Sequence, residues 1–271
     1  DSQILATRPF TTSPVPITGS SKNTTIQRIC WIKYHQSQTM FDRFLVFGAG
    51  AIGTYIGVSL ANQGHQVDFL ERPDDLEGLF QRGLQLKTGD STLKITQPNL
   101  IPSLETIPKD HYDLAVLALK TYHLEELLPE LRRNQNKLPP FLCLLNGVES
   151  EGILAQVLGD ERVLSGTVTS AVDRVEKGNA VVSKMRGVGL AGEHPLIGKL
   201  INAFEDAGLN PRRYANPQDM KWSKLITNLL GNATAAILNM TTAQVYADPD
   251  LYQLEKEQIK ETLAVMRLLH I

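Results

Sequence analysis

The sequence has little net charge, few cysteines and no long hydrophobic run. Its formal net charge is −2 at pH 7, so electrostatics gives no reason to expect a nucleic acid or an anionic membrane as a partner. Its two cysteines, Cys30 and Cys143, cannot form a disulfide framework, which favours a reducing compartment. No run approaches the length of a transmembrane helix. What remains is a chain of 271 residues, 42% hydrophobic, long enough for two globular domains.

The most informative segment, residues 43–72, predicts a strand, a tight turn, a helix and a second strand. Gly48, Gly50 and Gly53 have G-x-G-x-x-G spacing directly after an apolar run. In this spacing the glycines permit the turn, the approach of phosphates to the backbone, and close helix–strand packing. The alternative is a glycine-rich turn without a ligand. Because the motif follows a strand and opens a helix, it indicates a site for a dinucleotide pyrophosphate.

The choice between NAD and NADP depends on the end of the second strand, where Glu71 precedes Arg72. An acidic residue there accepts hydrogen bonds from the ribose hydroxyls of NAD. A guanidinium one residue later can bind a 2′-phosphate. Adjacent strand-end residues point to opposite sides, so Glu71 need not repel that phosphate. A solvated loop charge is the alternative for Arg72.

Alternating strand and helix patterns predict the fold. Strands are expected at 84–88, 92–96, 113–120, 140–145, 163–172 and 180–190, and helices at 122–133 and 195–207. Residues 210–220 have the composition of a polar junction, and every later pattern is helical. The sequence therefore predicts an α/β fold, with a Rossmann-type doubly wound parallel sheet over residues 40–212. A mostly α-helical second domain is expected over 213–271.

Both ends of the chain are unusual. Residues 1–39 are rich in Ser and Thr and contain one acid, Asp1. A transit peptide shares this bias, but an upstream extension before a true start at Met40 is the favoured interpretation; either way the segment is expected to contribute no fold. The other end stops inside an amphipathic helical pattern that begins near Pro249. We expect a truncated helical domain whose last helix exposes a broad apolar stripe.

Lys120 and Asn146 each end a predicted strand. Ligands of open α/β sheets lie beyond the carboxyl ends of the strands, so both side chains are candidates for cofactor or substrate binding. A snorkelling lysine and a plain Asn-Gly turn are the alternatives.

Lys224, Asn228 and Asn232 recur at i, i+4 and i+8, which predicts one polar stripe on a helix. Asn is a poor helix former and an odd choice for an exposed face. An ammonium group followed by two amides suits ketone reduction, because it supplies a proton donor and neutral groups that orient a polar substrate. An ordinary polar face or a hydrogen-bonded helix seam would give the same pattern.

Together these motifs resemble the ketopantoate reductases, from about residue 43 to the C-terminus. The resemblance depends on GAGAIG, Arg72, LALK, LNGVE and WSKLITNLLGNATAAI, in this order. It implies NADPH as hydride donor, Lys224 as catalytic general acid, and a substrate site lined by Asn146, Asn228 and Asn232. No metal is implied. The implied cofactor-binding residues are Gly48, Ala49, Gly50, Ala51, Ile52, Gly53, Arg72, Lys120 and Asn146.

The implied reaction is the reduction of 2-dehydropantoate (ketopantoate) to pantoate for pantothenate and coenzyme A synthesis. The resemblance also implies a cytoplasmic enzyme, with a homodimer as a candidate assembly. The chain departs from the family pattern because it ends before a late T-E-I-D-like segment whose glutamate contacts the substrate. Two alternatives stay open: a paralogous reductase of another 2-oxoacid, and a non-catalytic NADP(H)-binding module.

Overall fold

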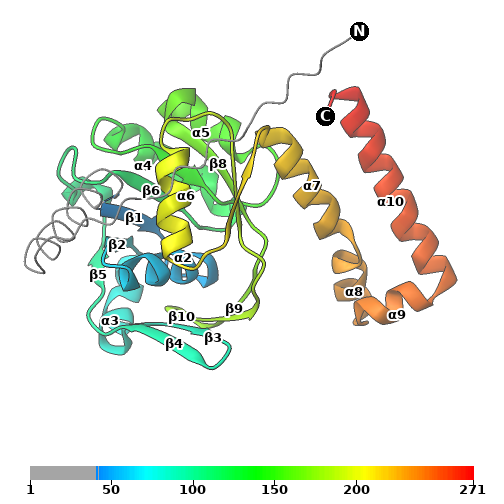
Figure 1. The fold of residues 1–271 in the computed structure, drawn as a ribbon, viewed down its shortest axis with the longest axis horizontal. Coiled ribbons are helices and arrows are strands. Elements are labelled where there is room, and N and C mark those ends of the chain that lie inside the picture. The colour runs from blue at the N-terminus through cyan, green and yellow to red at the C-terminus, as the bar shows by residue number, and fades with distance from the viewer. Residues whose placement is uncertain (1–40, 42) are drawn as a thin grey trace, which may run out of the picture. The chain divides into compact units, whose positions relative to one another are not determined.

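The computed structural model describes residues 41 and 43–271. The expectations for residues 1–39 lie outside this part of the chain. Within it, eight strands form a larger sheet in the order β12-β11-β8-β7-β6-β1-β2-β5 (Figure 1). These strands are β1 (Arg43–Phe47), β2 (Gln66–Leu70), β5 (Asn99–Ile101), β6 (Leu114–Leu117), β7 (Phe141–Cys143), β8 (Val163–Val168), β11 (Val188–Ala191) and β12 (Pro211–Tyr214). All neighbouring pairs are parallel except β8 with β11.

Helices cover both faces of this sheet, as the apolar strand β1 requires. Phe44 and Val46 belong to the same hydrophobic core as residues of α2 (Ala51–Asn62) and α6 (Ile197–Asp206). Their neighbours Leu45 and Phe47 belong to a second core with α4 (Leu124–Asn134) and α5 (Ser150–Leu158). The predicted doubly wound parallel sheet is therefore confirmed.

A single buried thiol lies in this second core. Cys143 in β7 is fully buried, and burial, reinforced by the Glu151 carboxylate, raises its pKa to about 12. The thiol therefore stays protonated and packs as a small hydrophobic side chain.

Strand β1 lies between β2 and β6. Successive strands are therefore added to the sheet first on one side of β1 and then on the other. In such folds the crevice at this point, beyond the carboxyl ends of the strands, receives the ligand. We call this side of the sheet the ligand edge. It is where β1, β6 and β7 end.

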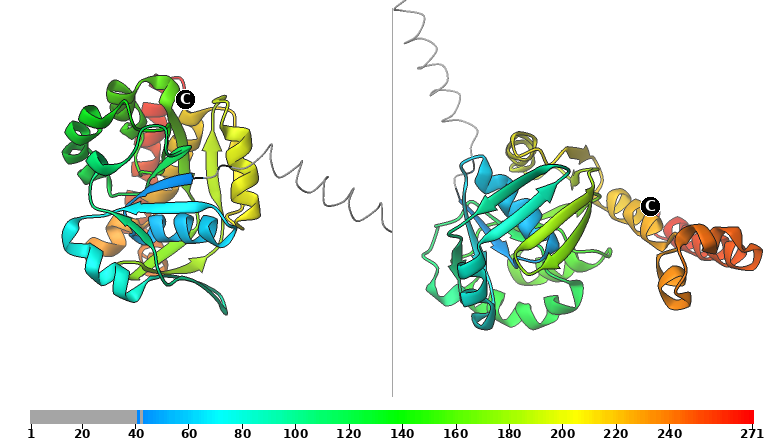
Figure 2. Two further views of the ribbon diagram at one scale, coloured as in Figure 1. Left: turned by 90° about the vertical axis from the view of Figure 1, so that its left-hand side faces the viewer. Right: turned by 90° about the horizontal axis from the view of Figure 1, so that it is seen from below.

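Some predicted strands do not join the larger sheet. Instead β3 (Leu84–Thr88), β4 (Ser91–Ile95), β9 (Ala171–Glu176) and β10 (Asn179–Lys184) form a smaller described sheet, in the order β4-β3-β10-β9. Its pairs are antiparallel except β3 with β10. Leu86 and Val182 pack in the core that contains α2. The ribbon views show the smaller sheet beside that helix (Figures 1 and 2). Only one face of this sheet is buried, so its strands cannot take interior places in a sheet covered on both sides.

The predicted polar junction over 210–220 is wrong. Its first part is the edge strand β12, whose side chains are half-buried or exposed, so hydrophobic alternation is absent. Its last part begins α7 (Pro217–Leu229), four residues before the predicted helical start at Lys221. The Asn216 side chain accepts a hydrogen bond from the Gln218 amide at 2.8 Å, and Pro217 occupies the first helical position. Both features are typical of a helix N-terminus.

Three further helices complete the described chain: α8 (Asn232–Leu238), α9 (Thr242–Ala247) and α10 (Pro249–Leu268). α10 is the red helix in Figures 1 and 2, and it contacts α7 and α9. Its apolar stripe is exposed in part: Leu254, Val265 and Leu269 each expose more than two fifths of their surface, whereas Leu251 and Ile259 are half-buried. None of the helices in the described part combines the length and hydropathy that crossing a membrane requires.

Candidate active site

The glycine turn between β1 and α2 is built to admit a ligand. Gly48 has a φ of +92°, and a Cβ on Gly53 would lie 1.7 Å from the Gly48 carbonyl oxygen. These two glycines are therefore required by the turn itself. A Cβ on Gly50 would meet no described atom within 4 Å. The space in front of Gly50 is where a pyrophosphate would approach the backbone.

The first turn of α2 offers free donors at the same place. No side chain caps the helix at Gly50, and its first turn has no acidic residue. The amides of Ala51 and Ile52 therefore face the open end of the helix without an intrahelical acceptor. Together with the helix dipole they fit the negative charge of a dinucleotide pyrophosphate.

Glu71 and Arg72 point to different sides, as predicted. The Glu71 side chain is buried and accepts a hydrogen bond from the Ala49 amide in the glycine turn. The Arg72 guanidinium is exposed and lies 3.5 Å from His123 Nδ1 and 3.8 Å from a Glu126 carboxylate oxygen. Arg72 also precedes the first turn of α3 (Pro73–Arg82). Its charge is therefore displayed at the ligand edge, whereas that of Glu71 is enclosed.

Lys120 and Asn146 lie near the ligand edge but not at the strand ends that the sequence predicts. β6 ends at Leu117 and β7 at Cys143, three residues earlier in each case. The strands are short because the chain turns out of the sheet into loops. Thr121 Oγ1 donates to the Asn146 carbonyl oxygen at 3.1 Å. The two loops therefore lie together, with the Lys120 and Asn146 side chains exposed.

α7 is fixed to the Asn146 loop by a buried lysine that sequence reasoning missed. Lys221 is 4% exposed, and its Nζ donates to the Leu145 carbonyl oxygen at 2.9 Å. Nζ also lies 2.6 Å from Glu151 Oε1 in α5, an ion pair without hydrogen-bond geometry. The signal in the sequence is a lysine between two large apolar residues, Met220 and Trp222. Both are buried in the structure. This contact places the next turn of α7, which carries Lys224, beside the ligand edge.

Lys224 is half-buried, and its pKa is lowered, first by burial and then by the positive charge of Arg186. Arg186 lies between β10 and β11, and its amide donates to Ser170 Oγ at 3.0 Å. Within residues 41 and 43–271, no acidic side chain forms an ion pair with Arg186. Arg186 is therefore near enough to Lys224 to disfavour its charged form, and within the described residues neither cation has an ion-pair partner. Sequence reasoning missed Arg186, because nothing in its local sequence links it to α7.

The predicted single helix carrying Lys224, Asn228 and Asn232 is wrong. α7 ends at Leu229, and α8 begins at Asn232. Gly231 between them has a φ of +69°, and its amide donates to a buried Glu255 carboxylate oxygen at 2.7 Å. The break is therefore stabilised by α10. Asn232 still reaches α7, because its Nδ2 donates to the Asn228 carbonyl oxygen at 2.8 Å.

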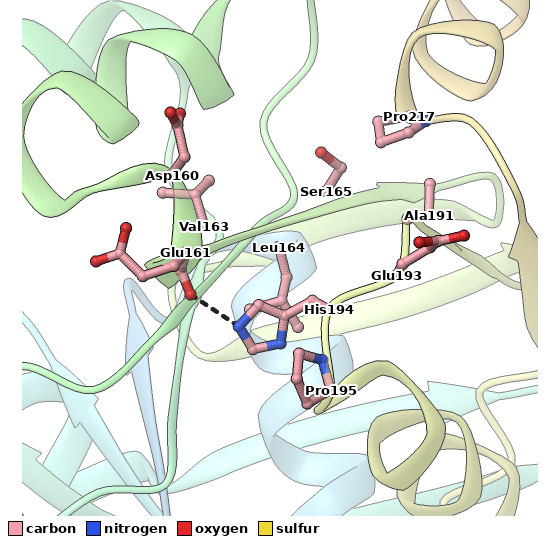
Figure 3. Close-up of a pocket in the computed structure, with 11 residues that line it drawn as sticks. Asp160, Glu161, Val163, Leu164, Ser165, Ala191, Glu193, His194, Pro195 and Pro217 are labelled. Atoms are coloured by element: carbon pink, nitrogen blue, oxygen red, sulfur yellow. Dashed lines mark hydrogen bonds between the residues drawn. The ribbon is translucent and has the colours of Figure 1, made fainter.

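A separate pocket of about 520 Å³ lies on the opposite edge of the sheet (Figure 3). It is lined at the start of β8 by Val163 and at the end of β11 by Ala191. Both nitrogens of its His194 are engaged, one with the Glu161 carbonyl oxygen at 2.9 Å and one with the Leu196 amide at 3.1 Å. None of the candidate site residues lines it, and the pocket therefore contributes nothing to the ligand edge.

The chain also matches a known protein family. Residues 44–193 match the family described as ketopantoate reductase PanE/ApbA, and residues 216–271 match its C-terminal family. The 2-dehydropantoate 2-reductase of Pyrococcus horikoshii is 29% identical over 224 residues, which are 81% of this chain and 71% of that protein.

Two solved structures are also similar. The crystal structure of 2-dehydropantoate 2-reductase from Geobacter metallireducens has a TM-score of 0.72 at 26% identity, covering 82% of this chain and 74% of the other. The ternary structure of D-mandelate dehydrogenase with NADH and anilino(oxo)acetate has a TM-score of 0.74 at 21% identity, covering 84% and 75%. This second likeness concerns the fold alone. Since the two family matches span both the sheet and the helical region, the chain belongs to the ketopantoate reductase family.

Proposed function

We propose that this protein reduces the keto group of a 2-oxoacid with NADPH, and that its substrate is ketopantoate, which becomes pantoate. The observation that carries this proposal is Lys224, a half-buried ammonium of lowered pKa at the ligand edge of a dinucleotide-type fold. Such an ammonium is suited to proton donation. The family and the relatives named above support the substrate class.

NADPH, when bound, supplies a hydride to the carbonyl carbon. Lys224 then gives its Nζ proton to the carbonyl oxygen as negative charge develops, which yields the secondary alcohol and NADP⁺. In this proposal the substrate carboxylate lies near Lys224 and Arg186, because an anion there offsets the repulsion that lowers the pKa of Lys224. Asn146, Asn228 and Asn232 orient the substrate through neutral hydrogen bonds, which do not repel the incoming hydride.

The assay is ketopantoate-dependent oxidation of NADPH, with 3-methyl-2-oxobutanoate, which lacks the terminal hydroxymethyl group, as the matched control. A clear preference for ketopantoate is expected, because a site built to pair a hydroxyl discriminates against its absence. Equal kcat/KM for both acids would assign the chain to a broader 2-oxoacid reductase. NADPH binding without turnover of any 2-oxoacid would identify a non-catalytic cofactor-binding module.

Two glycine substitutions separate cofactor binding from folding. Gly50→Ala is expected to leave the Tm unchanged, because φ is −74° and the Cβ meets open space, but to weaken NADPH binding about tenfold, or about 1.4 kcal/mol. Gly53→Ala places a Cβ against the Gly48 carbonyl and is expected to destabilise the fold by about 1–3 kcal/mol or more. Thermal unfolding and fluorescence titration measure both effects. Equal behaviour of the two variants would contradict this assignment.

Arg72 is proposed to bind the 2′-phosphate. We expect wild type to bind NADPH more tightly than NADH by about 1–3 kcal/mol, the range of a charge-assisted hydrogen bond. Arg72→Ala should remove most of this difference while leaving NADH affinity unchanged. Fluorescence titration with both nucleotides is the measurement, and equal wild-type affinities would refute the proposal.

A further inference from the structure

The smaller sheet reaches the glycine turn through the tight turn between β9 and β10. The Gly178 amide in this turn donates to the Ala49 carbonyl oxygen at 2.9 Å, and the Gly178 carbonyl accepts from the Gln85 amide at 2.7 Å. Gly178 has a φ of +80°, and a Cβ there would lie 2.6 Å from a Leu79 methyl group. The β9–β10 turn is therefore held close against the glycine turn by its backbone.

This contact brings Lys177 to the end of β2. Lys177 Nζ lies 2.8 Å from Glu71 Oε2 and also donates a hydrogen bond to Asp75. The other Glu71 oxygen accepts from the Ala49 amide. Burial acts to lower the pKa of Lys177, but the hydrogen bonds to Asp75 and Glu71 outweigh it, and the pKa is raised. Lys177 therefore stays cationic at neutral pH and directly neutralises Glu71.

If Lys177 were absent, the negative charge at the β2–α3 junction would disfavour a bound phosphate. Glu71, Asp74 and Asp75 lie in sequence around Arg72 at the β2–α3 junction. A Rossmann domain places the adenine ribose of its cofactor here, and a carboxylate at the end of β2 repels a 2′-phosphate. A fourth carboxylate, that of Glu126, lies 3.8 Å from the Arg72 guanidinium. Lys177 pairs with Glu71 and Asp75; without it, Arg72 would be the cation left among these carboxylates.

We propose that Lys177 determines cofactor specificity by neutralising Glu71 and holding it on the Ala49 amide, so that a 2′-phosphorylated dinucleotide is accepted beside Arg72. This inference rests on the proposed function, because it requires that the glycine turn binds NADP(H). It assigns a role to the smaller sheet, which packs in the core that contains α2 but does not join the larger sheet. The selectivity of the site thus depends on a turn far along the chain from the glycine motif.

The test measures dissociation constants for NADPH and NADH, and for 2′,5′-ADP and 5′-ADP, by fluorescence or calorimetry. Lys177→Met is expected to weaken NADPH and 2′,5′-ADP about tenfold or more, with NADH and 5′-ADP little changed. Lys94→Met is the matched control, since Lys94 is exposed on β4 in the same small sheet and forms no ion pair within the described residues. It should change none of the four constants.

The double variant Lys177→Met/Glu71→Gln distinguishes neutralisation from direct phosphate binding. If Lys177 acts through Glu71, removing the carboxylate restores the NADPH-to-NADH affinity ratio of wild type. An unchanged ratio in Lys177→Met, or no restoration in the double variant, would overturn the inference. Lys177→Gln, with Tm measured for each protein, provides a second uncharged variant if the first is poorly folded. If wild type bound none of the four nucleotides, the proposed function itself would fail, which is a separate outcome.

Discussion

Lys224→Ala is expected to lower kcat by about 10²–10⁴-fold, the usual contribution of a positioned general acid. The variant loses the proton that must reach the carbonyl oxygen as hydride arrives. Affinity for NADPH should not change, because the glycine turn and Arg72 remain intact. Steady-state kinetics and nucleotide titration measure the two quantities, and Lys199→Ala on the exposed face of α6 is the control. An unchanged kcat would give Lys224 a structural role only.

The pH profile provides an independent check on Lys224. A general acid must be protonated, so activity is present below its pKa and is lost as the pH rises through it. Because burial and Arg186 lower this pKa from 10.5, the alkaline loss should begin below the range of an ordinary lysine. Arg186→Gln should raise the pKa and move the loss to higher pH. The same variant should raise the KM for the 2-oxoacid, since it removes one of the two charges proposed to face the carboxylate.

Lys221→Met is expected to destabilise the protein by about 3–5 kcal/mol, the usual effect of leaving one member of a buried ion pair alone. Glu151 would be left without the ammonium 2.6 Å away, in a place where its side chain is 16% exposed. The Leu145 carbonyl would also lose its hydrogen bond from Nζ. Denaturant unfolding measures the change. We further expect a fall in kcat, because α7 would no longer be held beside the Asn146 loop.

Two comparisons separate this effect from a general loss of charge. Lys260→Met removes an exposed lysine that lies 2.8 Å from Glu257 in α10, and solvent screening should make this loss undetectable. Lys221→Met/Glu151→Leu should recover much of the stability, since the buried charge is then absent. If Lys221→Met unfolded like wild type, the pair would not anchor α7. If stability fell while the kcat of the folded fraction stayed normal, the anchor would not position Lys224.

Some features of the candidate site could be predicted from the local sequence, and others could not. Gly48 and Gly53 could be predicted from spacing alone, because each answers a steric requirement within a few residues. The opposite orientations of Glu71 and Arg72 likewise follow from the alternation of a strand. The break in the polar stripe was not predictable in the same way. It depends on Gly231 and on Glu255, which arrives from α10.

The sequence by itself determined the order of the main elements, the glycine turn and the family, because these depend on periodicity and short motifs. Only the tertiary structure decided which strands left the larger sheet, where α7 begins, and which charges meet. Lys221 with Glu151, Lys224 with Arg186, and Lys177 with Glu71 are pairs from distant parts of the chain. The physical reason is that electrostatic interaction depends on distance in space and on burial. Neither quantity exists until the sheets and helices have packed.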